Sequence, residues 1–99
     1  MTTIVVEEAG EELQAAATWY ESEREGLGQD LLVEADRALS AIGRSPTTWP
    51  LVPGSKLVRR FLLTRFPYAA YFVIRDGLVI VLAFGHTSRK PGYWRNRLR

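Results

Sequence analysis

Residues 68–84 read YAAYFVIRDGLVIVLAF, and this stretch decides the fold. We interpret Tyr68 to Ile74 as a strand, and Asp76-Gly77 is the two-residue sequence typical of a tight β-hairpin turn. Leu78 to Phe84 is apolar at every position, which predicts a second strand that is buried on both faces at the centre of a sheet.

Two further strands are predicted on either side of this hairpin in the chain. Leu57 to Phe66 is rich in aromatic and aliphatic side chains interrupted by arginines, and Pro67 ends it. The β-branched run Ile4-Val5-Val6 predicts a short edge strand at the N-terminus.

Two helices are predicted between these strands. Apolar side chains at helical spacing indicate a first helix over residues 8–25, and they form a stripe of Leu13, Ala16, Ala17 and Tyr20. Gly26 is the expected left-handed cap of this helix. A second helix follows at once and ends at Gly43, with the stripe Leu31, Ala35, Ala38, Leu39 and Ile42. Because the connection is so short, we expect an antiparallel helical hairpin. Residues 47–55 are predicted to form a loop, and we expect Trp19, Tyr20 and Trp49 in the core.

The predicted fold class is therefore α+β, in one domain over residues 1–99. An N-terminal helical hairpin packs on a mainly antiparallel sheet of about four strands: the short N-terminal strand, then a three-stranded meander. The basic, aromatic tail allows a short final helix from about Gly92.

Composition excludes several classes of function. The chain has no cysteine and one histidine, which excludes disulfide scaffolds, thiolate zinc sites and histidine-cluster metal sites. Its longest apolar run is far shorter than the roughly 20 residues that span a bilayer. Its N-terminus lacks the basic flank that is typical of a secretory signal. We expect no cofactor, no metal, no membrane contact and a cytoplasmic location.

Charge is segregated along the chain. Residues 1–43 hold ten acids and two bases, whereas residues 44–99 hold eleven bases, nine of them arginine, and one acid. A basic half favours a polyanion or an acidic protein as partner, and we assign polyanion binding to Lys56, Arg59, Arg60, Lys90 and Arg95. The alternative is that the two halves neutralise each other in the fold. Adjacent Arg59 and Arg60 face opposite ways, so that one can bind a polyanion while the other pairs with a helix carboxylate.

Any catalysis is predicted at Arg65, His86, Arg89 and Tyr93. Arg65 and His86 each end a predicted strand, and Arg89 and Tyr93 follow closely, so that these ends can meet at one rim of the sheet if the strands are antiparallel neighbours. This set suits RNA cleavage by the ribose 2′-hydroxyl. His86 would act as acid or base, Tyr93 would be its partner if neighbouring arginines lower its pKa, and Arg65 and Arg89 would stabilise the phosphate. Structural roles are the alternative: a hydrogen-bonded strand-end histidine, and Tyr93 with Trp94 covering the core. We interpret Glu7, Glu8, Glu11 and Glu12 as surface acids favoured by the helix dipole.

Several motifs in order along nearly the whole chain resemble the RelE/ParE superfamily of toxins from bacterial type II toxin–antitoxin modules. They are Ala17-Thr18-Trp19-Tyr20-Glu21, Gly26-Leu27-Gly28, Ser45-Pro46 with Trp49-Pro50, Arg59 to Leu63, Arg65 to Tyr68, and His86 with Arg89, Pro91 and Tyr93-Trp94.

The resemblance implies a helical hairpin on an antiparallel sheet, and a cognate antitoxin that wraps and neutralises the toxin. It leaves two activities open: a ribosome-dependent mRNA endonuclease (mRNA interferase), or a ParE-type inhibitor that binds DNA gyrase without its own catalysis. Arg65 matches a strand arginine of the nuclease type, whereas the His86 to Trp94 tail resembles chiefly ParE-like members. The resemblance also implies a role in plasmid stabilisation.

Overall fold

The computed structural model describes residues 1–90 and 92–97, so that Pro91 and Arg99, which entered the motif and charge patterns, lie outside the described residues. The helices are α1 (Glu7–Glu23) and α2 (Leu27–Arg44), with short 3-10 turns η1 (Pro46–Thr48) and η2 (Arg95–Arg97). The strands are β1 (Thr2–Val5), β2 (Arg59–Leu62), β3 (Tyr68–Arg75) and β4 (Leu78–His86). The predicted fold class is confirmed, and the C-terminal helix is a 3-10 turn.

The four strands form one sheet in the order β1-β4-β3-β2. β2, β3 and β4 make the predicted antiparallel meander, and β1 pairs with β4 in parallel. Asp76 and Gly77 both have positive φ, as the tight hairpin turn between β3 and β4 requires. β4 is therefore central, which explains why its sequence is apolar on both faces.

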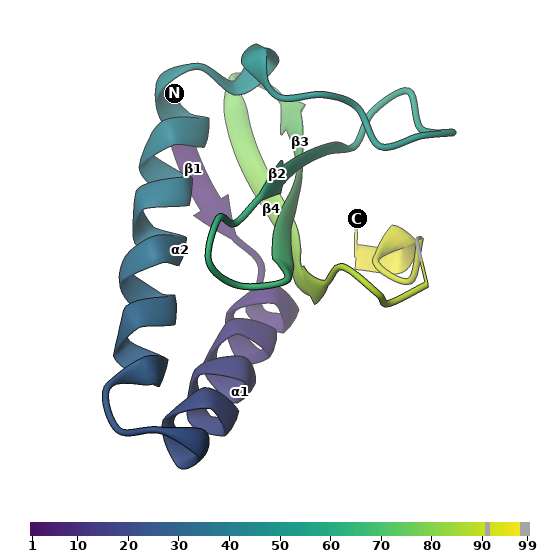
Figure 1. Ribbon diagram of the computed structural model, residues 1–99. Helices are drawn as coiled ribbons and strands as arrows, with labels where there is room; N and C mark the ends of the chain where they lie inside the picture. The colour runs from purple at the N-terminus through teal and green to yellow at the C-terminus, as the bar shows by residue number, and fades with distance from the viewer. Residues whose placement is uncertain (91, 98–99) are drawn as a thin grey trace.

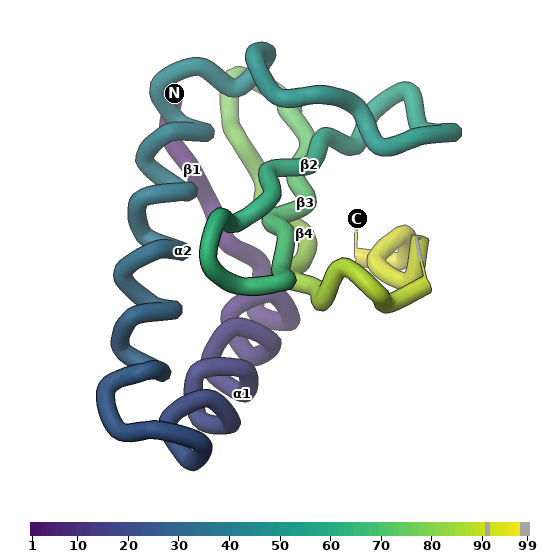
Figure 2. The backbone as a smooth tube through the Cα atoms, in the orientation of Figure 1, coloured from purple at the N-terminus to yellow at the C-terminus, as the bar shows by residue number. Residues whose placement is uncertain are grey.

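Both helices cover one face of this sheet (Figures 1 and 2). The core on that side includes Ile42 of α2 together with Phe72, Val81 and Phe84 of the sheet. A β-bulge shifts the register between Tyr71 and Phe72, so that Val81 and Phe84, three residues apart on β4, both reach the helix side. The other face has its own apolar cluster, which includes Tyr71, Leu82 and Trp94.

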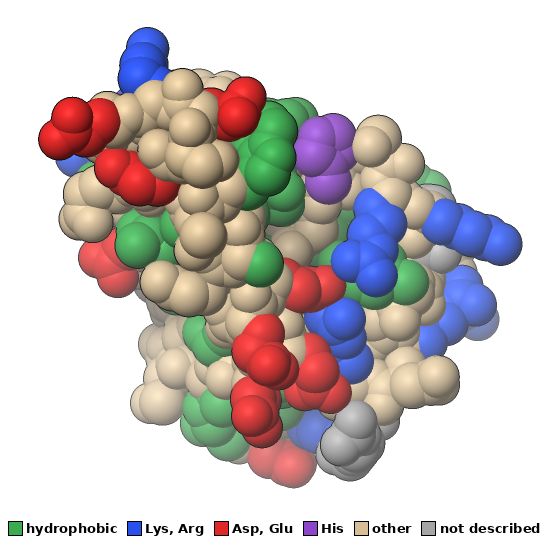
Figure 3. Space-filling model, turned by 90° about the horizontal axis from the view of Figure 1, so that it is seen from below, with side chains coloured by type: hydrophobic (Ala, Val, Ile, Leu, Met, Phe, Trp, Pro, Cys, Tyr) green, Lys and Arg blue, Asp and Glu red, His purple; other side chains and the backbone are tan. Residues whose placement is uncertain are grey.

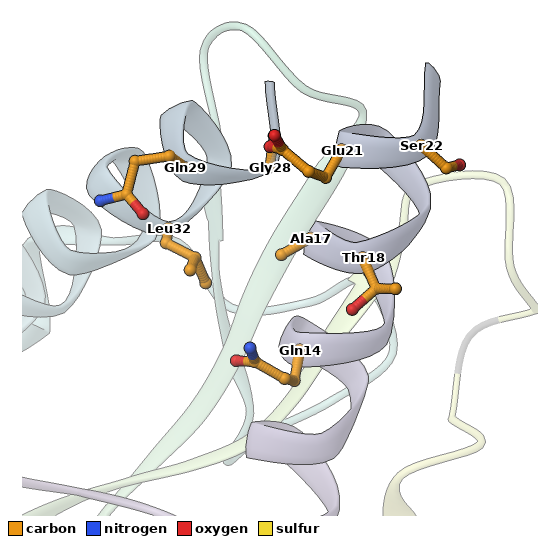
Figure 4. A pocket seen from close by; sticks show the side chains of 8 residues that line it. All are labelled: Gln14, Ala17, Thr18, Glu21, Ser22, Gly28, Gln29 and Leu32. Carbon is orange, nitrogen blue, oxygen red and sulfur yellow. The ribbon is translucent and has the colours of Figure 1, made fainter. Parts of the chain in front are cut away.

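The connection between the helices is a turn of glycines that the Glu21 carboxylate holds in place. Gly26 has a φ of 88°, the left-handed conformation predicted for it. Its predicted role as the cap that ends the first helix is wrong, because α1 ends with Arg24 as its C-cap and Gly26 is the residue that precedes α2. The backbone N–H groups of Gly26 and Gly28 donate to the Glu21 carboxylate at 2.8 and 2.9 Å. Figure 4 shows the Glu21 side chain of α1 pointing toward Gly28 of α2. Gly28 lies close to α1, because a Cβ added there would stand 2.3 Å from the Ala17 carbonyl oxygen. These contacts explain the Gly26-Leu27-Gly28 motif as a close helix–helix turn.

Three further predictions about local structure need correction. Trp19 is not in the core, since 58% of its surface is exposed. The strand expected over residues 57–66 is limited to β2, because the chain turns away after Leu62. The second helix extends through Gly43 to Arg44, and only Ser45 separates it from Pro46.

Candidate functional site

A cleft of about 300 Å³ lies between α1 and the C-terminal end of β4. Its lining includes Glu12, Trp19, Tyr68, His86 and Arg89, and we call it the β4-end cleft. Figure 3, the view from below, shows the histidine and several basic side chains on one side of a hollow and acidic side chains toward the helices. The cleft thus combines aromatic surface, an imidazole, a guanidinium and a carboxylate.

His86 is the last residue of β4, as its position in the sequence predicted. Its ring packs edge-on against Tyr68, with 5.3 Å between ring centroids. The Ser88 backbone N–H donates to His86 Nδ1 at 3.1 Å, and Ser88 Oγ lies 2.8 Å from the same nitrogen. Because Nδ1 accepts, the neutral ring carries its proton on Nε2, which makes no hydrogen bond within the described part of the chain.

Glu12 joins three parts of the chain beneath this cleft. Its carboxylate accepts from Arg97 Nη1 at 2.7 Å and Nη2 at 3.1 Å, from the Phe84 backbone N–H at 3.1 Å, and from Arg89 Nη1 at 3.4 Å. The Glu12 and Arg97 side chains are largely buried, and their hydrogen bond raises the pKa of Arg97. Glu12 is therefore not the surface acid expected from the helix-dipole pattern. It is the anchor that holds the C-terminal segment on the sheet.

Tyr93 lies within this anchor. The Arg89 guanidinium stacks on its ring at 3.6 Å, and the ring hydroxyl is buried without a hydrogen bond of normal geometry among the described residues. A Cβ added to Gly85 would stand 2.2 Å from that hydroxyl, so Tyr93 fills the space above the glycine. Burial and then the nearby Glu12 charge raise the pKa of Tyr93 to about 12, and the opposing effect of Arg89 and Arg97 is smaller. The prediction that neighbouring arginines lower the pKa of Tyr93 is wrong, because the effect of burial is larger than that of the arginines.

The raised pKa of Tyr93 predicts a loss of stability in alkali. An unfolded chain releases the phenol proton near pH 10, whereas the folded protein retains it to about pH 12. The unfolded state is favoured as its tyrosine ionises, so the free energy of unfolding falls between these two values. We expect Tyr93→Phe to remove this part of the fall, as measured by urea unfolding at a series of pH values. A wild-type Tyr93 that ionises near pH 10 would contradict the prediction.

Arg65 does not join the cleft. It follows β2 in a loop that the Glu34 carboxylate binds through the backbone N–H groups of Thr64 and Arg65. Its guanidinium pairs with Asp30 of α2 at 3.4 Å, and it lines a separate pocket beside α2. The structure thus brings His86, Arg89 and Tyr93 near one another, and it directs Arg65 toward the helices.

The residues predicted to bind polyanions do not gather at a single site. Arg59 donates to the carbonyl oxygens of Thr47 and Trp49, at 3.3 and 2.7 Å, and not to a helix carboxylate. Lys56 and Arg95 line a pocket on the sheet face away from the helices, and Lys90 is exposed in the tail. Polyanion binding by Arg60 and these residues stays a prediction.

Charge segregation is partly resolved by pairing. Asp30 with Arg65, and Glu12 with both Arg89 and Arg97, each join an acid of the first half to a base of the second. Within residues 1–90 and 92–97 there is no cluster of three or more side chains of the kinds that hold metal ions. The helices of this described part are too short or too polar to cross a membrane.

Three residues of the cleft were not predicted from the sequence as site residues: Glu12, Trp19 and Tyr68. Glu12 and Trp19 are seven residues apart on α1, two helical turns, and so lie on the same side of the helix next to the buried stripe. This spacing is the signal in the sequence for Glu12 and Trp19. It is weak, because the helix dipole also accounts for acids at the start of a helix and a tryptophan beside an apolar stripe suggests burial.

Comparison with known proteins supports the fold. No protein-family model and no curated protein matches the chain. Among solved structures, the chain is similar to one described as "Chromosomal ParDE TA system from P. aeruginosa", where TA denotes toxin–antitoxin. The TM-score is 0.77 at 16% identity, over 87% of this chain and 95% of the other. The likeness confirms the fold that the RelE/ParE resemblance implied.

Proposed function

We propose that this protein is the toxin of a type II toxin–antitoxin module, that a cognate antitoxin neutralises it, and that it acts by binding DNA gyrase. The observation that carries the toxin assignment is the fold shared with a chain of a ParDE toxin–antitoxin system. The proposal implies a cytoplasmic protein that needs no membrane and no cofactor.

Binding without catalysis is favoured by the state of two predicted catalytic side chains. Arg65 is paired with Asp30 outside the β4-end cleft, so it does not contribute charge to a phosphate held there. The Tyr93 hydroxyl is buried and its pKa is about 12, far above the neutral pH at which a general acid or base is most effective. A ribose 2′-hydroxyl attack would lack both an assembled acid–base pair and the second arginine.

A ribosome-dependent mRNA endonuclease is the second candidate, and His86 is the observation that favours it. Its Nε2 can exchange a proton with a substrate, since Ser88 engages the other ring nitrogen. Arg89 lines the same cleft, where it can contact a phosphate if it releases Glu12. This candidate requires the ribosome or the message to supply the missing acid–base partner.

The proposed gyrase activity is tested with the purified full chain and purified gyrase. We expect loss of negative supercoiling, or accumulation of cleaved DNA, as the chain is added, and arrested growth when it is expressed alone in bacteria. A heat-unfolded sample of the same chain is the control. Unchanged supercoiling at high molar excess would reject gyrase as the target.

The endonuclease candidate is tested in a cell-free translation extract. It predicts nicked ribosome-bound message, and a loss of about 10²-fold in cleavage rate for His86→Gln, because a general acid or base contributes about that factor. Thr87→Ala, at an exposed neighbouring position, is the matched control. Intact message and continuing translation would reject the nuclease.

A further inference from the structure

A second pocket lies on the sheet face away from the helices, between the loop before β2 and the C-terminal segment. Its volume is about 360 Å³, and we call it the rear groove. Figure 1 shows both of these segments projecting on the side of the sheet opposite α1 and α2. The groove is therefore separate from the β4-end cleft.

The floor of the rear groove is apolar and well packed. Val52, Val58, Leu82 and Trp94 are all buried in one cluster. The Trp94 ring stacks on Tyr71, with 5.6 Å between ring centroids, and is only 4% exposed. A ring covered in this way offers an edge for apolar contact, but it presents no open face on which a nucleotide base could stack.

The wall of the groove is preorganised by Ser55. Its hydroxyl accepts from the backbone N–H groups of Leu57 at 3.2 Å and Val58 at 2.9 Å. The Val52 N–H donates to the Val58 carbonyl oxygen at 2.8 Å, which closes the loop at its base. Leu57 lines the groove, and 64% of its surface is exposed. An ordered loop that presents an exposed leucine is typical of a contact surface.

The charge of the groove has one sign. Lys56 and Arg95 line it, and no acidic side chain from the described residues does. Within residues 1–90 and 92–97, none of the ion pairs we describe involves either base. A ligand carboxylate would therefore meet two cations that have no competing partner in the described part of the chain.

We propose that the rear groove binds an acidic peptide segment of the antitoxin, with one large apolar side chain on the floor and a carboxylate between Lys56 and Arg95. The inference rests on the proposed function, because it assigns the segment to the antitoxin. A peptide fits better than a small carboxylate, since the exposed Leu57 in the groove lining adds apolar surface to that of the buried floor. It fits better than nucleic acid, since two cations on an apolar floor are too few to follow a phosphate backbone.

The probe is the synthetic peptide acetyl-Asp-Glu-Leu-Phe-Glu-Asp-amide, titrated into the ¹⁵N-labelled full chain and followed by NMR. We expect saturable shifts of the amide signals of residues 52–58 and 92–95. Lys56→Glu and Arg95→Glu should each weaken binding by about threefold or more, as expected for exposed charge pairs. Arg75→Glu, an exposed arginine at the far end of β3, is the matched control and should change binding less.

Three further ligands separate the proposed occupant from others. A peptide with Gly-Gly in place of Leu-Phe should bind much more weakly, and equal binding would show that charge alone drives the contact. A short oligothymidylate or 4-phenylbutyrate that binds the same residues as tightly as the peptide would overturn the peptide assignment. Absence of shifts at residues 52–58 and 92–95 with the first peptide would overturn the site.

The outcome is independent of the toxin test. If the chain inhibits gyrase but does not bind the peptide, the proposed function stands and the rear groove is rejected as a docking site. If the chain binds the peptide but neither arrests growth nor inhibits gyrase, the peptide site stands and its assignment to an antitoxin is rejected.

Discussion

Replacing Glu12 with glutamine is expected to lower the free energy of unfolding by about 2–4 kcal/mol, because it leaves the largely buried Arg97 without its counter-charge. Glutamine keeps the shape of the side chain but offers a single acceptor oxygen to donors that now share two. The measurement is urea unfolding at neutral pH, followed by circular dichroism.

The effect should be concentrated in the C-terminal segment. Arg97 and Arg89 bind Glu12 from that segment, so its amide protons should exchange faster in Glu12→Gln while those of β3 change less. Glu11→Gln is the matched control, because Glu11 is the exposed neighbour on the same helix and should change stability by less than about 0.5 kcal/mol. Equal effects of the two substitutions would contradict the anchoring role of Glu12.

This anchor also bears on the proposed activity. Arg89 is held between the Glu12 carboxylate and the Tyr93 ring, which limits its freedom to meet a phosphate in the β4-end cleft. If the endonuclease candidate were correct, releasing Arg89 through Glu12→Gln would raise binding of RNA to the cleft. A purely gyrase-binding toxin gives no reason to expect that gain.

Elements specified by local sequence could be predicted well. The β3–β4 hairpin follows from two strand-forming runs around Asp76-Gly77, and the helical hairpin follows from two apolar stripes separated by Gly26-Leu27-Gly28. In both cases the residues that determine the element are within a few positions of one another. The fold class then follows, because a helical hairpin with an apolar side must cover an apolar sheet face.

Side-chain partners in the site could not be predicted in the same way, because they join distant positions. Glu12 is 77 residues from Arg89 and 85 from Arg97, and nothing in a helix pattern indicates which of several acids will be covered. Arg65 was expected at a strand end, but β2 stops at Leu62 and the loop that follows is bound by Glu34, 31 residues away from Arg65. Burial of the Tyr93 hydroxyl depends on the missing side chain of Gly85, which is visible only once the strand and tail are placed together.

Substitution of alanine for two helical glycines is expected to change stability in opposite directions. Gly28→Ala should lower the free energy of unfolding by about 1–3 kcal/mol, because the new Cβ would stand 2.3 Å from the Ala17 carbonyl oxygen and 3.0 Å from Glu21 Cβ. Gly10→Ala should raise it by about 0.5–1 kcal/mol, because nothing lies within 4 Å of a Cβ there and alanine favours the helix. Urea unfolding of both variants beside the wild type measures the two effects.

The opposite signs isolate packing from helix propensity. Both glycines lie near the start of a helix, Gly10 as the fourth residue of α1 and Gly28 as the second of α2, so helix propensity favours alanine at each. Propensity alone therefore cannot give opposite signs, and a loss of stability at Gly28 reports the contact between α1 and α2. The obstacle at Gly28 is backbone, which cannot move aside as a flexible side chain would, so the helices must separate or the glycine turn must distort. Separation would also lengthen the hydrogen bonds from the Gly26 and Gly28 N–H groups to Glu21, and faster exchange of those two amides would accompany the loss of stability. A Gly28→Ala variant as stable as Gly10→Ala would mean that the helices do not touch at this point.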